Sequence, residues 1–388
     1  MKTSFWDIIS KPNVICILYI VFSSGVQIVE NAFDREVRIS YIFYAIMLIS
    51  LLIKIISDRK LSINLLIIES VLLFVSVSYL ITYNTLNEEN YSVVVSAITC
   101  ILTAPLLFKY LDYSDFYGWR MIEWIFIVYL LINVGLYIVD GPSQRAIDDN
   151  VMRFYGASDN PNQFAILIFS LVLINFYGGG LRYNIINIIS LLLILFSGSR
   201  LYLAMALVVV IFSTCKKIKL KTVNILFFVF ALFGMGGAVL YKLFSSGLLD
   251  RLFLLGLDSN GRFYLYYSAI DAFIYSSFFE MLAGVSITDR YLTLTALTPT
   301  HSFAESSFFA MAILFGFFGI FMFLWYFITI FNLSRKISYK IISIFAFLSL
   351  ALNDIILYPQ GFVSITVAMI VLATDSRKNS LFYKCSER

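Results

Sequence analysis

The sequence predicts an all-α polytopic membrane protein with about twelve transmembrane helices, built as a single integral membrane domain over residues 1–388. Of the residues, 60% are hydrophobic and 13% are charged, whereas a soluble domain is roughly half apolar and a quarter charged. Apolar runs recur along the whole chain, and a run of about 20 residues crosses a bilayer core as a helix. These runs lack the alternation of apolar and polar residues that is typical of barrel strands. Because lipid offers no hydrogen-bond partners, the backbone groups of each run must pair within a helix.

Taken in chain order, the apolar runs predict twelve spans separated by short polar segments. They are 13–30, 40–57, 61–83, 92–111, 118–139, 163–177, 184–197, 200–214, 222–243, 304–331, 341–357 and 360–374. Two of the connections are longer than the rest, a smaller loop at 140–162 and a large one at 244–303. Within the large loop, residues 261–273 have the pattern of an amphipathic helix lying on a membrane surface.

The distribution of basic residues predicts how these spans are oriented. With the amino terminus inside, most of the 28 lysines and arginines fall in cytoplasmic segments, whereas most acids fall in the two long loops. The positive-inside rule therefore places both termini in the cytoplasm and both long loops outside.

The run 184–214 is interrupted only by Ser197-Gly198-Ser199-Arg200. A single crossing would put the basic cluster 216–221 on the side opposite Arg182, so we predict a tight helical hairpin. Each arm is short, so its apex should lie below the outer membrane surface. Arg200 is then either a snorkelling arginine or an anion ligand in a cavity at membrane depth, and we favour the second.

Other polar residues on the predicted outer side form the remaining candidate site. Arg262 lies at the start of the 261–273 segment and is either a lipid headgroup contact or a phosphate ligand. Arg153 lies beside acidic residues of the smaller loop and is either their partner or a phosphate ligand. With Arg200 they would suit a diphosphate, because a guanidinium binds phosphate oxygens in bidentate fashion without a metal. Asn160 and Asn162 begin a helix as capping residues or contact a sugar, and Tyr264 is a further sugar-contact candidate.

His301 and Glu305 lie four residues apart at the start of the span 304–331, so on a helix they share one face. Ser302 and Glu305 also fit a capping box. The alternative is that Glu305 or His301 is the base that accepts a proton from a sugar hydroxyl. The four cysteines have no metal-like spacing, and no nucleotide-binding or zinc motif is present. We therefore predict no metal, no cofactor and no nucleic-acid partner.

Four segments together resemble the O-antigen polymerase and ligase superfamily of bacterial inner membranes. They are "DNPNQFA" at 159–165, "SGSRLYLA" at 197–204, "SNGRFYLYYSAIDAF" at 259–273 and "ESSFFAMAILFGFFG" at 305–319. They occur in the family's order and on the same side of the membrane, and they cover roughly residues 150–320. In that family the arginine of the Gly-Ser-Arg turn is implicated in holding the lipid diphosphate, which corresponds to Arg200 here.

One departure separates the two branches of that superfamily. The ligase branch has a histidine eleven residues before the first glycine of the Gly-x-x-Gly pair, whereas here Glu305 lies eleven before Gly316 and His301 lies fifteen before it. An acidic residue followed by serine looks more like the polymerase branch.

The resemblance implies a metal-independent, GT-C-like glycosyltransferase in the bacterial inner membrane, with its active site facing the periplasm. Its substrates would be undecaprenyl-diphosphate-linked oligosaccharides, which it would join into O-antigen or a related surface polysaccharide. A chain-length regulator and a flippase are the implied protein partners. The alternatives are an O-antigen ligase, which transfers glycan to lipid A core, and, with less support, a repeat-unit flippase.

Overall fold

The computed structural model describes part of the chain, and every structural statement below concerns that part. The described residues are 46, 47, 49, 53, 100, 116–140, 154–156, 158, 161–177, 181–218, 266, 269–271, 273–284, 306–353 and 359–386. Within these residues the regular structure is entirely helical, which confirms the all-α prediction. The chain divides into two compact units, residues 121–259 and residues 1–120 with 260–388.

The unit of residues 121–259 holds most of α6 and all of the helices up to α9. Their bounds are α6 Phe116–Asp140, α7 Pro161–Ile174 with the 3-10 turn η1 Asn175–Tyr177, α8 Leu181–Ser197 and α9 Arg200–Ile218. These helices coincide with the apolar runs predicted at 118–139, 163–177, 184–197 and 200–214, with ends that differ by up to four residues. The apolar runs therefore located the helices correctly in this unit.

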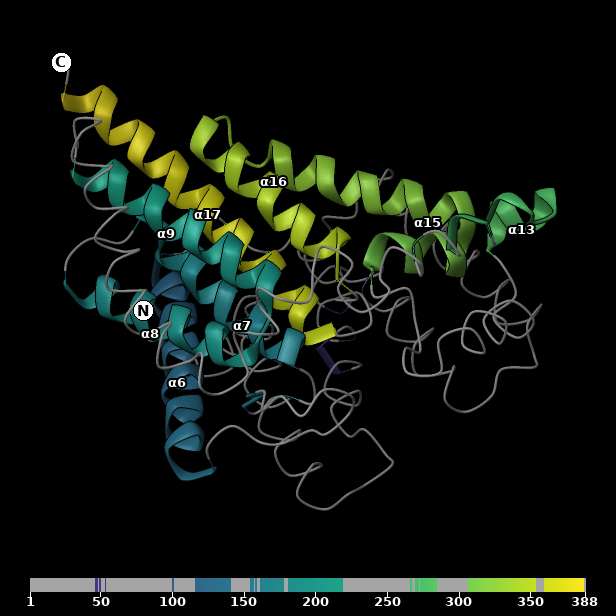
Figure 1. Ribbon diagram of the computed structural model, residues 1–388. Coiled ribbons are helices and arrows are strands. Elements are labelled where there is room, and N and C mark those ends of the chain that lie inside the picture. Colours follow the sequence, from purple (N-terminus) through teal and green to yellow (C-terminus); the bar gives the residue numbers. More distant parts are fainter. Residues whose placement is uncertain are drawn as a thin grey trace. The chain divides into compact units, whose positions relative to one another are not determined.

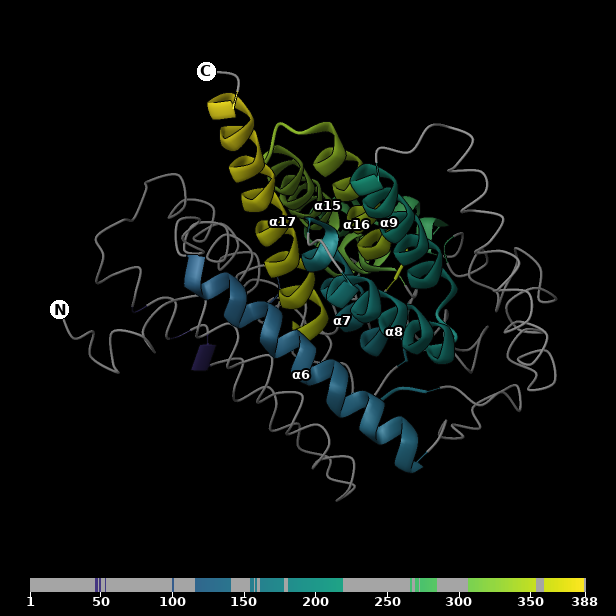
Figure 2. The same cartoon turned by 90° about the vertical axis from the view of Figure 1, so that its left-hand side faces the viewer.

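Side-chain contacts show that α7, α8 and α9 alternate in direction. Tyr202 lies beside Phe169 and Phe212 beside Phe176, with ring centroids 5.9 and 6.0 Å apart, so α9 runs parallel to α7. The hydroxyl of Ser213 donates to the carbonyl of Phe176 at the far end of α7, at 2.6 Å. Since α8 connects the two, α8 and α9 form the helical hairpin predicted at 184–214, and Figure 2 shows the three helices together.

The start of α6 lies at the same end of this unit as the start of α8. Arg182 forms an ion pair with Glu123, with 3.1 Å between nitrogen and oxygen, and its guanidinium lies 4.6 Å from the ring centre of Trp124. Glu123 lies inside the predicted span 118–139, and it is paired near one end of α6 with a basic partner that is half exposed.

The other unit contains α13, α15, α16 and α17, with bounds Phe278–Ala283, Ser307–Asn332, Ile337–Ala351 and Pro359–Ser386. The runs 304–331, 341–357 and 360–374 correspond to the last three, but α16 begins four residues before its run and α17 continues twelve residues beyond its run. The first turn of α16 includes Lys340, whose ammonium lies 4.6 Å from the ring centre of Phe331. A lysine that folds back on an aromatic ring is compatible with a helix end.

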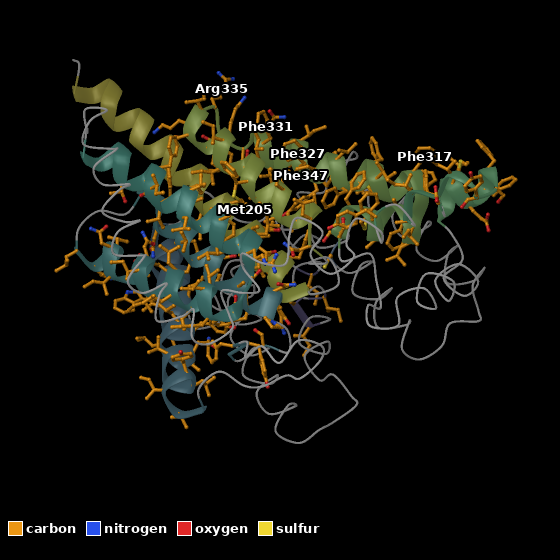
Figure 3. All side chains as sticks on the ribbon, in the orientation of Figure 1. Met205, Phe317, Phe327, Phe331, Arg335 and Phe347 are labelled. Atoms are coloured by element: carbon orange, nitrogen blue, oxygen red, sulfur yellow. The ribbon has the colours of Figure 1, made fainter. Side chains whose placement is uncertain are left out.

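Helices α15 and α16 are antiparallel neighbours (Figure 1). The hydroxyl of Tyr339 donates to the carbonyl of Ile330 at 2.9 Å near the connection, and Phe327 packs on Phe347 with ring centres 4.1 Å apart (Figure 3). At the far end, the hydroxyl of Ser307 donates to the carbonyl of Asn353 at 2.6 Å. The pair is therefore tied at both ends and along its middle.

Among the described helices, Ser307–Asn332 alone combines the length and apolar content needed to cross a membrane. Several shorter helices are also apolar, namely Phe126–Val139, Pro161–Ile174, Leu181–Ser197, Arg200–Thr214, Ile337–Ala351 and Gln360–Ala373. The predicted number of about twelve spans stays a prediction, because much of the chain lies outside the described residues.

Candidate functional site

Arg200 is the first residue of α9 and directly follows the turn that ends α8. Gly198 makes this turn with φ of +67°, a value that side-chain-bearing residues rarely adopt. The hydroxyl of Ser197 donates to the carbonyl of Ile194 at 2.6 Å, and the amide of Ser199 donates to that hydroxyl at 3.3 Å. Arg200 is partly buried. It occupies a helix amino terminus, where the helix dipole favours an anion.

The end of the smaller predicted loop is bound to this turn. The amide of Phe154 donates to the carbonyl of Phe196 at 3.0 Å. The ring of Phe154 makes edge contacts with Phe164 and Tyr137, at 5.2 Å in both cases, and Tyr137 stacks on Phe196 at 4.6 Å. The loop 140–162 was predicted only as an outer loop, whereas its residue Phe154 contacts α6, α7 and α8.

A second contact holds the same segment against α6. The hydroxyls of Tyr129 and Ser158 share a hydrogen bond of 3.1 Å, and the side-chain amide of Asn133 donates to the carbonyl of Tyr129 at 2.7 Å. Gly156 has φ of +56°, and a Cβ added there would lie 2.0 Å from the Oδ1 of Asn133, so a side chain would strain the backbone and displace Asn133. Tyr129 and Asn133 could not be singled out from the sequence, because single polar residues do not interrupt an apolar run.

Two of the predicted site residues are described, and both lie in this unit. Asn162 is the second residue of α7 and is partly buried, after Pro161 at the first helical position, where proline is favoured. The helix thus begins where the Asp-Asn-Pro-Asn motif predicts. The other described site residue is Arg200. Arg153, Asn160, Arg262, Tyr264, His301 and Glu305 lie outside the described residues.

The interior of this unit contains buried polar side chains. Asn175, Asn187 and Ser190 are buried. The side-chain amide of Asn175, the Oδ1 of Asn187 and the hydroxyl of Ser190 have no hydrogen-bond partner among the described residues. Asn187 and Ser190 are three residues apart and share one face of α8. In the sequence, the three-residue spacing of Asn187 and Ser190 is the only sign of this polar face. Averaging the hydropathy over the whole helix hides it.

Helix α15 starts at a junction with the end of α16. Ser306 is its N-cap and accepts from the amide of Phe309 at 3.3 Å, while its hydroxyl donates to the carbonyl of Ala351. The amide of Ser307 donates to the carbonyl of Asn353 at 2.7 Å. The capping box predicted from Ser302 and Glu305 therefore does not start this helix, because Ser306 caps it and Glu305 precedes the cap.

The predicted Gly-x-x-Gly pair lies at a break inside α15. Gly316 has φ of 60° and ψ of −143°, whereas the residues on both sides are helical. A Cβ on Gly316 would lie 2.3 Å from the carbonyl oxygen of Met281, and one on Gly319 would lie 2.1 Å from that of Met311. The glycines that the resemblance selected therefore allow close approach of backbones.

In comparisons with known proteins, no protein-family model matches the chain, and no curated protein matches it.

Proposed function

We propose that this chain is an O-antigen polymerase of a bacterial inner membrane, with about twelve spans in a GT-C-like arrangement and both termini in the cytoplasm. It transfers a growing glycan from its undecaprenyl diphosphate carrier to a new lipid-linked repeat unit at the periplasmic side. The placement of Arg200 at the apex of the α8–α9 hairpin is the observation that carries the proposal.

The length of the hairpin arms supports a ligand role for Arg200. α8 has 17 residues and α9 has 19, so they are about 26 and 29 Å long at 1.5 Å per residue. A bilayer core is roughly 30 Å thick, which leaves the apex at or below the outer surface. An arginine kept at that depth is costly unless it pairs with an anion or a backbone carbonyl, or lines a water-filled cavity.

The diphosphate of the carrier is the anion that fits this position. Arg200, Arg262 and Arg153 hold it and stabilise the charge that develops on the leaving group, an effect that low dielectric strengthens. The bond between Phe154 and Phe196 supports the inclusion of Arg153, because Arg153 precedes Phe154 directly in the chain. Asn160, Asn162 and Tyr264 contact the glycan.

Glu305 is the proposed base. In the transfer step, the acceptor hydroxyl loses its proton to the Glu305 carboxylate while its oxygen bonds to the anomeric carbon of the donor sugar. The bond from that carbon to the carrier diphosphate breaks, and the electron pair leaves with the diphosphate. The N-cap at Ser306 supports this role, since it removes the capping of α15 as an explanation for Glu305. His301 is the alternative base.

Two alternatives differ in what the chain does with the same lipid-linked substrate. An O-antigen ligase passes the glycan to lipid A core, and a His301 base would favour it. A repeat-unit flippase moves the lipid without breaking a bond. Flippases and other transporters are commonly built from paired repeats, and the sequence shows none.

Lipopolysaccharide profiling of a deletion strain distinguishes these functions. Loss of long chains with one repeat unit still on the core indicates the polymerase. Loss of every repeat unit from the core indicates the ligase and overturns the proposal, as does accumulation of lipid-linked repeat units on the cytoplasmic side, which indicates the flippase.

Complementation with single variants then tests the base. We expect Glu305→Gln to lower polymer formation by about 10²–10⁴-fold, the usual contribution of a general base, with the protein present at normal abundance. His301→Gln is the matched control and should retain most polymer. The reverse result would assign the base to His301 and move the ligase ahead of the polymerase.

A further inference from the structure

The first turn of α15 is tied to the last carbonyls of α16. The hydroxyl of Ser306 donates to the carbonyl of Ala351, and the hydroxyl and the amide of Ser307 both donate to the carbonyl of Asn353, at 2.6 and 2.7 Å. The last carbonyls of a helix have no partner within it, so these bonds join the start of one helix to the end of another. We refer to Ser306, Ser307, Ala351 and Asn353 as the α15–α16 junction.

The junction is closed to solvent, and its bonds fix Ser306 in place. Ser306, Ser307 and Asn353 are buried. The hydroxyl of Ser306 also accepts from the amide of Phe309 at 3.3 Å, so one hydroxyl both caps α15 and binds the end of α16. A buried hydroxyl that donates and accepts at once has its position set by both partners.

The first segment of α15 is held along its length as well, because α15 folds back on itself at Gly316. The ring of Phe308 lies 5.9 Å from that of Phe323. The segment before the break therefore packs against the segment that follows it, and α16 lies beside them (Figure 1).

A third contact comes from the described part of the segment 261–273. Contacting pairs follow one another along this segment and along α15, namely Tyr266 with Phe309, Ala269 with Ile313, and Phe273 with Phe317 (Figure 3). The two segments therefore run in parallel, with Tyr266 at the end where the junction lies. There the hydroxyl of Tyr266 donates to the carbonyl of Leu352 at 3.5 Å.

The junction adjoins a proposed site residue in the chain. Glu305, which lies outside the described residues, directly precedes Ser306. Since consecutive Cα atoms are about 3.8 Å apart, a fixed Ser306 restricts the position of the residue before it. The hydroxyl of Ser306 is itself occupied by bonds within the protein, so any effect of Ser306 on the reaction passes through a neighbour.

We infer that the α15–α16 junction positions the base of the transfer reaction, with Ser306 as a positioning residue that acts through Glu305. A displacement of about 1 Å in a reacting group costs about 10²-fold in rate, so a tie at the residue next to the base is felt in the chemical step. This inference rests on the proposed function.

The test measures kcat and KM of the purified full-length protein with radiolabelled undecaprenyl-diphosphate-linked repeat units. Ser306→Gly removes the bond to Ala351, while glycine still serves at the start of a helix. We expect kcat to fall at least tenfold with KM nearly unchanged, because the lost tie acts on the transition state and not on binding. Ser306→Thr keeps the hydroxyl and should restore most of kcat.

Ser343→Ala is the matched control, because the hydroxyl of Ser343 bonds only within α16, to the carbonyl of Lys340. It should leave kcat unchanged. If Ser306→Gly lowers the abundance of the protein, Ser307→Ala carries the test, since it removes the hydroxyl bond to Asn353 and keeps the amide bond. It should lower kcat with KM unchanged, and an unchanged kcat would overturn the inference.

The Glu305→Gln background separates positioning from a general loss of structure. If Ser306 acts through Glu305, Ser306→Gly should cost less than about threefold in that background. A tenfold loss in both backgrounds, or an unchanged kcat for Ser306→Gly alone, overturns this inference and leaves the proposed function in place. A normal kcat for Glu305→Gln overturns the proposed base and this inference together.

Discussion

The turn at Gly198 and the break at Gly316 both depend on a positive φ, but the two glycines have different structural roles. Both glycines have positive φ, +67° and +60°. Gly198 lies between two helices and is followed by Arg200, so the reversal leaves a charged residue at a helix start. Gly316 lies where α15 folds back on itself, so that the ring of Phe308 lies 5.9 Å from that of Phe323. The carbonyl oxygen of Met281 approaches the position that a Cβ on Gly316 would take.

The difference shows why each position needs glycine. Position 198 requires a positive φ, and asparagine also adopts such conformations. At Gly316 the backbone region is essentially restricted to glycine, and the neighbouring backbone leaves no room for a side chain. The sequence alone shows two glycines in apolar surroundings and does not indicate which of them is less tolerant of substitution.

The largest expected effect is that of Gly316→Ala. Backbone strain of about 1–3 kcal/mol and overpacking of about 1–3 kcal/mol should add to a loss of about 2–6 kcal/mol in the free energy of unfolding. Thermal unfolding of the purified protein in detergent measures it.

Two variants sharpen that comparison. Gly135→Ala is the matched control, because no atom lies within 4 Å of the added Cβ, and the change should stay below about 1 kcal/mol. Gly198→Asn should also leave a folded protein. An unchanged melting temperature for Gly316→Ala would contradict the break in α15.

The next largest effect concerns polymer formation and tests the role of Arg200, the charged residue that follows the Gly198 turn. A charge-assisted bond to phosphate contributes about 1.5–3 kcal/mol, so Arg200→Ala should lower polymer formation at least tenfold at normal abundance. Arg200→Lys should recover little, because the bidentate geometry is lost. Arg182→Ala is the control, since Arg182 pairs with Glu123 away from the apex. Full polymer from Arg200→Ala would return Arg200 to a snorkelling role.

Ser307→Ala should have a smaller effect on stability. It removes the bond from the Ser307 hydroxyl to the carbonyl of Asn353, which ties α15 to the end of α16, and should lower the unfolding free energy by about 1 kcal/mol. Ser349→Ala is the control, because its hydroxyl bonds only within α16, to the carbonyl of Ala346. Equal losses from the two variants would contradict a specific role for this junction.

The smallest effect should come from Glu123→Gln. Its partner Arg182 is half exposed, and exposed ion pairs contribute about 0–1 kcal/mol. The melting temperature should fall slightly at low salt and hardly at all at high salt, because salt screens exposed charges. A large loss that persists at high salt would show that the pair is buried more deeply than its exposure indicates.

Part of the candidate site was accessible from the sequence, and the reason is local. Arg200 follows a Ser-Gly-Ser break in an apolar run, and Asn162 follows a proline at a helix start, so both were found from their neighbours in the chain. The contacts of Tyr129 with Ser158 and of Ser306 with Ala351 join residues 29 and 45 positions apart. Isolated polar residues in apolar runs carry no signal that selects such partners.

The sequence by itself predicted where α6 to α9 and α15 to α17 lie, because each long apolar run must satisfy its own backbone hydrogen bonds as a helix. It also determined the hairpin, since basic clusters flank a run with a Gly-Ser turn at its centre. It did not predict α13. Only the tertiary structure decided that the segment 154–158 binds the hairpin apex and that α13 lies against the break at Gly316. Those contacts depend on backbone approaches within a few ångströms, which follow from packing in three dimensions and not from the order of residues along the chain.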